Sequence, residues 1–192
     1  MGGEGLMQVS IKVSGLELAQ ARLAEVNRKI DPVLRGALNT TANKARTVRY
    51  VNPLRGSLMP VFSRRALRVK RARGRLTNAR IIPSSSGVPV TRYLGWGYSK
   101  ISATRARIWV KGPKGHKVAA GFVNPSSFSR MPWSTRIRVR GAQKGFLSPA
   151  LGPSVAYWFK QLTDGQTIRW TNIFLQQEFE KRIRQEIAKG AR

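Results

Sequence analysis

Apolar residues recur at helical spacing near the start of the chain. Steps of three and four residues place one apolar stripe on a helix, formed by Leu16, Ala19, Leu23, Val26 and Ile30. Asp31-Pro32 interrupts the stripe, and because proline is tolerated at a first helical position, we expect a second helix to start there and run to Val48. This pattern is typical of an amphipathic helix pair packed on a sheet, and an inter-subunit coil is the alternative.

A second clear helical pattern lies between Thr171 and Lys189. Its apolar ridge repeats every four residues, through Leu175, Phe179, Ile183 and Ile187. Thr171 or Asn172 can cap the helix. Oppositely charged residues at helical spacing predict two ion pairs, Glu178–Arg182 and Arg182–Glu186.

Alternating and β-branched segments between the helices predict strands. They cover residues 9–13, 79–82, 88–94, 104–111, 117–123 and 135–140. In 104–111 we expect Arg105, Arg107 and Val110 on one face, with Ala106, Ile108 and Trp109 on the other. In 135–140, three arginines share one face because side chains alternate along a strand.

Turn-forming residues separate these segments. Residues 52–60 end the helical region, 83–87 form a loop, and 112–116 form a hairpin turn with a basic tip. Residues 124–153 form a long loop and strand insertion, and 155–162 are aromatic core. We therefore predict a single α+β domain over 1–192, with N-terminal amphipathic helices and a C-terminal helix packed on a mostly antiparallel sheet, and with extended basic arms or hairpins. Residues 1–8 are a disordered extension in this interpretation.

Charge changes this picture more than any motif does. The 192 residues hold 36 Lys and Arg but 8 Asp and Glu, which gives a formal charge of +28. No carboxylate occurs between Asp31 and Asp164, a stretch that carries 26 Lys and Arg. Self-repulsion at this charge opposes compaction, so we expect stability to depend on counter-charge from a partner or from salt.

The densest basic segment is Phe62–Arg80, where eight of nineteen residues are Lys or Arg. We interpret residues 55–80 as a basic arm, either solvated or ordered as a helix or hairpin on a polyanion. A solvated charged face is the alternative. The candidate residues that face DNA or a partner are Arg64, Arg65, Arg68, Lys70, Arg71, Arg73, Arg75, Arg105, Arg107, Lys111, Lys114, Lys117, Arg136, Arg138 and Arg140.

Residues that carry catalysis are scarce. The chain has no Cys and a single histidine, His116, so neither a thiolate site nor a histidine-based zinc site is expected. The carboxylate-free middle cannot supply a two-metal nuclease or a tuned general acid. No nucleotide-binding glycine fingerprint occurs. We predict no enzyme activity, no catalytic or metal-ligating residues and no cofactor. Tyr93–Tyr98 is aromatic and can stack bases, but such a segment more often belongs to a core or an interface.

No membrane span or secretory signal is expected, because the chain has no apolar run of 18 residues and no basic segment followed by an apolar run at its start.

The order of the segments resembles the minor tail protein Z, or tail completion protein, family of lambda-like long-tailed bacteriophages. The resemblance covers most of the chain, and residues 124–153 depart from it. The matching segments are Ile11-Lys12, Gly15-Leu16-Glu17, the helix from Ala37 to Arg49, the run Arg64–Arg75, Ala79-Arg80-Ile81, Gly121-Phe122-Val123 and Phe179–Arg184.

The resemblance implies a structural virion protein of the tail or neck, assembled in the host cytoplasm, that acts in tail completion and head–tail joining. It implies a homo-oligomeric ring, typically a hexamer, beside the tail terminator and the tail tube or head–tail connector proteins. Such a ring lines or approaches the channel for phage genomic DNA, which it contacts without sequence specificity.

Two other classes stay open. The first is a stand-alone basic nucleic-acid-binding protein of the ribosomal or packaging type, which binds as a monomer with a steep salt dependence. The second is a basic protein whose partner is an acidic protein ring, with no contact to DNA.

Overall fold

A computed structural model describes residues 15–25, 29–74, 78–134 and 147–190. The predicted strands at 9–13 and 135–140 and the extension 1–8 lie outside these ranges. The α+β class is confirmed, although the strands of the described part form four small sheets, in place of one. Contacts divide the chain into two compact units. Unit 1 contains Met1–Tyr50, Arg68–Ile82 and Leu162–Arg192, and unit 2 contains Val51–Leu67 and Pro83–Gln161.

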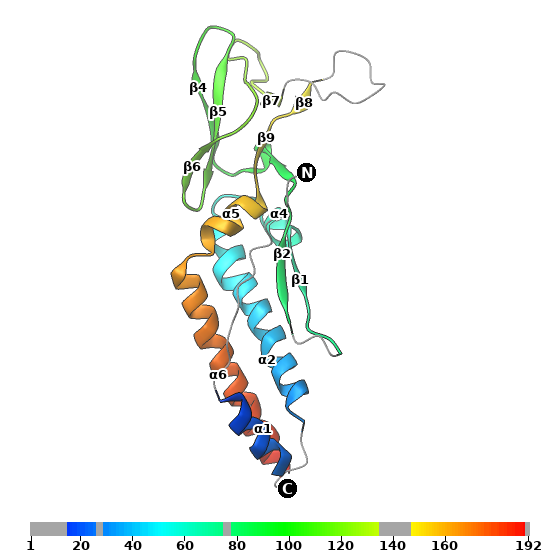
Figure 1. The fold of residues 1–192 in the computed structure, drawn as a ribbon. Helices are drawn as coiled ribbons and strands as arrows, with labels where there is room; N and C mark the ends of the chain where they lie inside the picture. Colours follow the sequence, from blue (N-terminus) through cyan, green and yellow to red (C-terminus); the bar gives the residue numbers. More distant parts are fainter. Residues whose placement is uncertain (1–14, 26–28, 75–77, 135–146, 191–192) are drawn as a thin grey trace, which may run out of the picture. The chain divides into compact units, whose positions relative to one another are not determined.

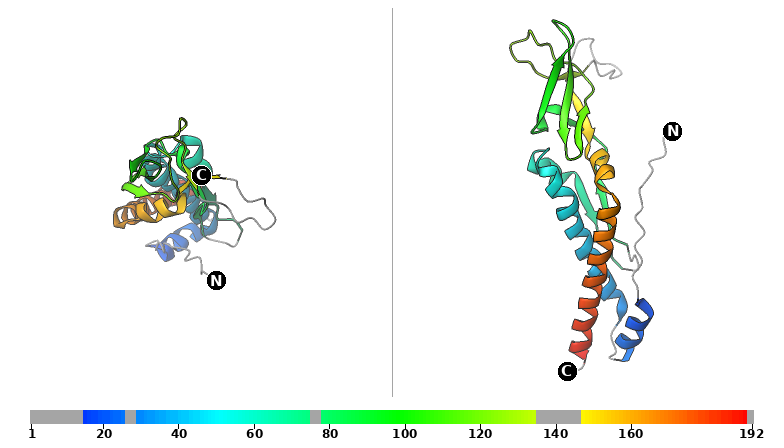
Figure 2. Two further views of the ribbon diagram at one scale, coloured as in Figure 1. Left: turned by 90° about the horizontal axis from the view of Figure 1, so that it is seen from above. Right: turned by 90° about the vertical axis from the view of Figure 1, so that its left-hand side faces the viewer.

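Unit 1 is built on three helices, α1 (Leu16–Glu25), α2 (Ile30–Ala45) and α6 (Gly165–Gly190). Figures 1 and 2 show α2 and α6 side by side. Their common core is made of Ala19, Leu23, Val33, Ala37, Leu175 and Phe179. The predicted stripes supply most of it, although Leu16 of the first stripe is exposed and Val33 was not predicted. After α2, the backbone continues as a π-helix, η1 (Arg46–Val51).

Helix α6 begins six residues before the predicted cap at Thr171. Asp164 caps it, because its Oδ1 accepts a hydrogen bond from the Thr167 amide at 2.9 Å. Thr171 lies inside the helix, where its hydroxyl donates to the Thr167 carbonyl at 2.7 Å. The cap prediction is therefore wrong: an earlier Asp supplied the cap, and Thr171 bonds back to the preceding turn.

The basic run forms a short helix and a two-stranded ribbon. Helix α4 (Pro60–Arg65) precedes strand β1 (Leu67–Lys70), which pairs with β2 (Arg80–Pro83). Within unit 1, Asn39 of α2 holds the ribbon through both amide atoms: Oδ1 accepts from the Ala72 amide at 2.8 Å, and Nδ2 donates to the Ala72 carbonyl at 3.2 Å. The run therefore contains a short helix and paired strands, whereas its ordering on a polyanion stays a prediction.

Unit 2 contains a three-stranded antiparallel sheet of β4 (Trp96–Lys100), β5 (Ala106–Gly112) and β6 (Gly115–Val118). The predicted hairpin turn joins β5 to β6, where Gly112 pairs with Gly115. Gly115 has φ +109°, a conformation that favours glycine. The predicted return strand 117–123 is wrong in its bounds, because β6 ends at Val118 and Val123 only bridges to Ala106.

Helix α5 (Val155–Leu162) contacts this sheet through Trp158, which lies against Gly112 at the end of β5. A Cβ on Gly112 would lie 2.1 Å from the Trp158 ring, so the glycine permits the ring to rest on β5. Trp158 Nε1 donates to the Tyr93 hydroxyl at 2.9 Å, and that hydroxyl donates to the Pro153 carbonyl at 2.6 Å. Tyr93 and Trp158 are both buried. The aromatic core predicted for 155–162 is present at Trp158.

The remaining elements of unit 2 are short. Strand β3 (Gly87–Pro89) pairs with β9 (Leu151–Ser154), and β7 (Trp133–Ser134) pairs with β8 (Ser148–Pro149). The strand predicted over 88–94 gives way to a 3-10 turn, η2 (Val90–Arg92). The segment expected to end the helices holds helix α3 (Asn52–Arg55).

Candidate polyanion-binding surface

Eleven of the fifteen candidate cations lie in the described part of the chain. Arg75, Arg136, Arg138 and Arg140 lie outside it. The eleven are all exposed: Arg64, Arg65, Arg68, Lys70, Arg71, Arg73, Arg105, Arg107, Lys111, Lys114 and Lys117. They belong to three local structures, namely the end of α4, the ribbon and the β4–β5–β6 sheet.

The first group ends helix α4. Arg64 and Arg65 occupy its last turn, where the helix dipole favours positive charge. Ser63, which directly precedes Arg64, is buried, and its hydroxyl donates to the Pro60 carbonyl at 3.0 Å. The neighbouring Arg92 guanidinium lies 5.9 Å from the Phe62 ring centroid. This end of the helix therefore carries two exposed cations and a third nearby.

The second group lies on the ribbon. Along β1, buried Leu67 and half-buried Val69 alternate with exposed Arg68 and Lys70, so the two cations share one face. Arg71 and Arg73 flank buried Ala72, the residue that Asn39 holds. We call Arg68, Lys70, Arg71 and Arg73 the ribbon cations. Because Asn39 fixes Ala72, the backbone that carries them is positioned before any ligand binds.

The third group lies on and beside the β4–β5–β6 sheet. Arg107 and Lys111 stand on the face of β5 opposite the Trp158 ring, which we call the outer face, whereas Lys117 stands on the other face. The predicted faces of β5 are wrong at two positions. Val110 is buried with Ala106 and Ile108, whereas half-buried Trp109 alternates with them, on the same face as Arg107 and Lys111. Trp109 and Val110 both follow the strict alternation of the strand. The prediction failed because it grouped the apolar Trp109 with the buried residues, although Trp109 lies on the outer face.

The outer face is completed by β6. Register places His116 opposite Lys111 and Val118 opposite Trp109, so these four side chains share it with Arg107. We call Arg107, Trp109, Lys111, His116 and Val118 the open sheet face. Trp109 and His116 rings meet edge to face at 4.9 Å. Lys117 lies on the other face, where its Nζ is 5.4 Å from the Tyr157 ring centroid.

A cavity of about 730 Å³ adjoins the open sheet face within unit 2. Two exposed arginines, Arg105 and Arg107, stand in its lining. The rest of the lining is mostly small or apolar, and consists of Ile101, Thr104, Ala106, Val118, Ala119, Gly121 and Phe122. Charge and apolar surface therefore meet at one concave site.

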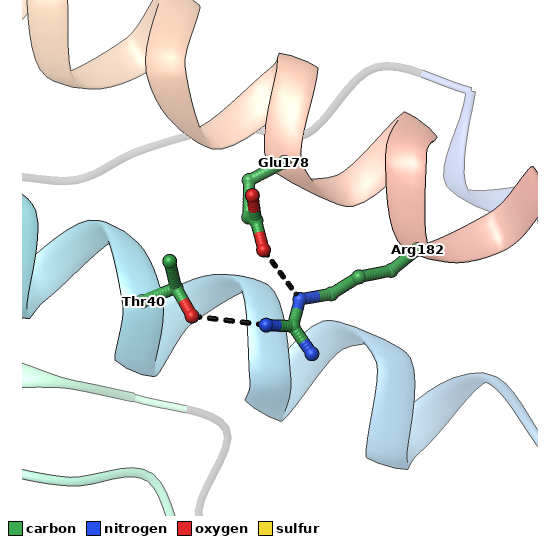
Figure 3. A network of polar contacts seen from close by, with 3 residues as sticks. All are labelled: Thr40, Glu178 and Arg182. Carbon is green, nitrogen blue, oxygen red and sulfur yellow. Dashed lines mark hydrogen bonds and ion pairs between the residues drawn. The ribbon is translucent and has the colours of Figure 1, made fainter. Parts of the chain in front are cut away.

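The carboxylates of the C-terminal part are engaged in or beside α6. Asp164 caps the helix, Glu178 pairs with Arg182 at 2.8 Å, Glu180 with Arg184 at 4.0 Å, and Glu186 with Lys189 at 2.8 Å. The Glu178–Arg182 pair was predicted. Figure 3 shows Arg182 also donating to Thr40 of α2, at 3.0 Å. These acids therefore lie among the cations of α6 itself.

Tyr93–Tyr98, singled out as an aromatic segment, is mainly structural. Tyr93 is buried, and Trp96 lies opposite the buried Val110. Trp109, in contrast, is an aromatic residue between two exposed cations, Arg107 and Lys111, on one face of β5, and the sequence pattern assigned it to the wrong face. The signal was present in the alternation Arg107, Trp109, Lys111.

Within the described ranges, no three His, Asp or Glu side chains come close enough to hold a metal ion. None of the helices there has both the length and the apolar character needed to cross a membrane. Comparison with family models, with curated proteins and with solved structures finds no match to this chain.

Proposed function

We propose that the protein is a non-enzymatic structural protein that binds nucleic acid through the phosphate backbone, without reading sequence. The observation that carries this proposal is the exposure of all eleven described candidate cations, while the acids of the C-terminal part are engaged in or beside α6. Lys and Arg that neutralise phosphates release counterions, which favours binding at moderate salt. Positions that touch only phosphates fix orientation but do not select bases.

The setting we propose is the head-proximal end of a phage tail, in tail completion and head–tail joining. The resemblance of segment order to the minor tail protein Z family supports this setting. A ring of such chains around a channel would multiply a charge of +28 per copy, which requires phosphate or acidic neighbours as counter-charge. DNA in transit through the channel supplies that charge.

Salt-dependent binding to duplex DNA tests the nucleic-acid part of the proposal. We expect a linear fall of log K with log salt, with a slope of about −0.9 per phosphate neutralised. A ribbon variant replaces the four ribbon cations with Gln. Its matched control replaces four exposed cations of α6 with Gln, namely Arg169, Lys181, Arg184 and Lys189. The ribbon variant should flatten the slope by about 0.9 for each phosphate that it no longer neutralises, and clearly more than the control does.

Equal slopes for the two variants would count against the ribbon as the DNA-binding element.

The setting is tested separately, by locating the protein in purified virions. Presence at the head–tail joint is the expected result, whereas salt-dependent DNA binding by a protein absent from virions would favour the stand-alone alternative. Retention of an acidic protein, but no nucleic acid, from a nuclease-treated lysate would favour the third class.

A further inference from the structure

We propose that the open sheet face is a binding site for single-stranded nucleic acid, in which Trp109 stacks on an unpaired base and Arg105, Arg107 and Lys111 contact the neighbouring phosphates. The inference rests on the proposed function and adds a substrate form to it. Phosphate contacts alone do not distinguish a duplex from a single strand, but an aromatic ring that stacks on a base does.

The cations stand on both sides of the ring. Arg107 and Lys111 are two positions before and after Trp109 on one strand, so all three side chains leave the same face at intervals of about 7 Å. A nucleotide within a strand has a base and a phosphate on each side along the backbone. The order cation, aromatic, cation matches that alternation along β5.

The ring is supported from below. A Cβ on Gly97, which pairs with Trp109 across the sheet, would lie 2.4 Å from the ring, so the indole lies directly over the glycine. His116 meets the ring edge to face. A ring held by these two neighbours loses little freedom on binding, which lowers the entropic cost of stacking.

The adjoining cavity extends the same chemistry. Its volume of about 730 Å³ lies within the range of small-molecule sites, and Arg107 and Val118 belong to both the cavity and the open sheet face. Exposed Ile101 and Val118 offer apolar walls to a second base, and Arg105 offers a cation to its phosphate. The charge is uniformly positive at the site, which complements a polyanion.

The test compares probes that differ only in their bases. The probes are oligo(dT) and oligo(U) of about 12 nucleotides, within the usual site sizes, an abasic strand of equal length, and a duplex. We expect the full-length protein to bind oligo(dT) about 10-fold more tightly than the abasic strand, because stacking contributes per base. Oligo(U) reports whether RNA is held equally well.

Two substitutions isolate the ring. Trp109→Leu fills the position without an aromatic face and should remove the preference for oligo(dT) over the abasic strand, while duplex affinity changes less than about 2-fold. Trp109→Phe keeps an aromatic face and should retain most of that preference. Circular dichroism confirms that each variant is folded.

The outcomes separate this inference from the function on which it rests. Absence of all binding to duplex and single strands by the native chain overturns both. If the native chain binds the duplex and binds oligo(dT) and the abasic strand with equal affinity, the inference alone is overturned. This comparison needs no variant. A competition with polyglutamate gives a further outcome that overturns the inference. If polyglutamate displaces oligo(dT) equally well from the native chain and from Trp109→Leu, and neither protein prefers oligo(dT) to the abasic strand, the open sheet face binds acidic protein.

Discussion

A Cβ atom on Gly36 would lie 2.5 Å from Nη1 of Arg182, so the guanidinium rests against the bare backbone of α2. The same guanidinium bonds Glu178 on its own helix and Thr40 on α2, as Figure 3 shows. Gly36 costs α2 about 1 kcal/mol relative to alanine. Gly36 therefore lowers the helix propensity of α2 but leaves room for a polar contact between α2 and α6, the two long helices of unit 1.

This relationship predicts a coupling between the two positions. Gly36→Ala alone should change the free energy of unfolding by less than about 0.5 kcal/mol, because the gain in propensity offsets the displaced hydrogen bond. In an Arg182→Ala background, Gly36→Ala should stabilise by about 1 kcal/mol. Urea unfolding of the native protein, Gly36→Ala, Arg182→Ala and the double variant measures this coupling free energy. Equal effects in both backgrounds would show that the contact carries no energy.

The ribbon's attachment to α2 gives a second prediction. Asn39→Ala removes two hydrogen bonds to Ala72 and should lower the free energy of unfolding by about 1–3 kcal/mol, because the buried Ala72 backbone loses its partners. Hydrogen exchange should accelerate at the Ala72 amide and remain unchanged at the sheet of unit 2. Replacing exposed Lys44 by Ala is the matched control on the same helix, and its exchange pattern should resemble the native one.

The Tyr93 hydroxyl, which joins Trp158 to Pro153, gives the third prediction. Tyr93→Phe leaves a buried indole N–H and a carbonyl without this partner, at a cost of about 2–3 kcal/mol. Tyr157→Phe keeps the ring that Lys117 contacts and serves as the control for deleting a hydroxyl. Thermal unfolding compares the two. A similar small effect in both would mean that the Tyr93 bonds contribute little.

Alkaline pH probes the same tyrosine. Burial raises the pKa of Tyr93 from its ordinary value of 10.0 to about 12. The folded protein therefore keeps this proton when the unfolded chain has lost it, and the stability from Tyr93 is complete below pH 10 and is lost as pH rises towards 12. One group contributes a slope of at most about 1.4 kcal/mol per pH unit. Subtracting the pH profile of the free energy of unfolding of Tyr93→Phe from that of the native protein isolates the contribution of Tyr93. Parallel profiles for the two proteins would contradict the prediction.

Local patterns identified the helices because their apolar stripes pack on each other. Leu175 and Phe179 lie in the core that the spacing predicted. Spacing could not locate the start of α6, because Asp164 and Thr171 are both competent caps and packing decides between them. It also could not pair β3 with β9, which are separated by more than sixty residues along the chain. Such contacts depend on the whole fold.

The candidate cations were predicted by composition, since long charged side chains stay exposed on almost any fold. The face of Trp109 was readable from its alternation with Arg107 and Lys111, but a tryptophan between Ile108 and Val110 also looks like core in a one-dimensional pattern. The position of its ring over Gly97 needed the structure.

The discontinuity of unit 1 has a consequence for synthesis. Val33 and Ala37 leave the ribosome well before Leu175 and Phe179, with which they form a core. At about 5–20 residues per second, roughly ten seconds pass between them. During that interval, α2 has no α6 to cover its apolar stripe, and the carboxylate-free stretch emerges among ribosomal RNA. We expect nascent chains to associate with RNA, and unit 1 can be completed only after α6 has been made.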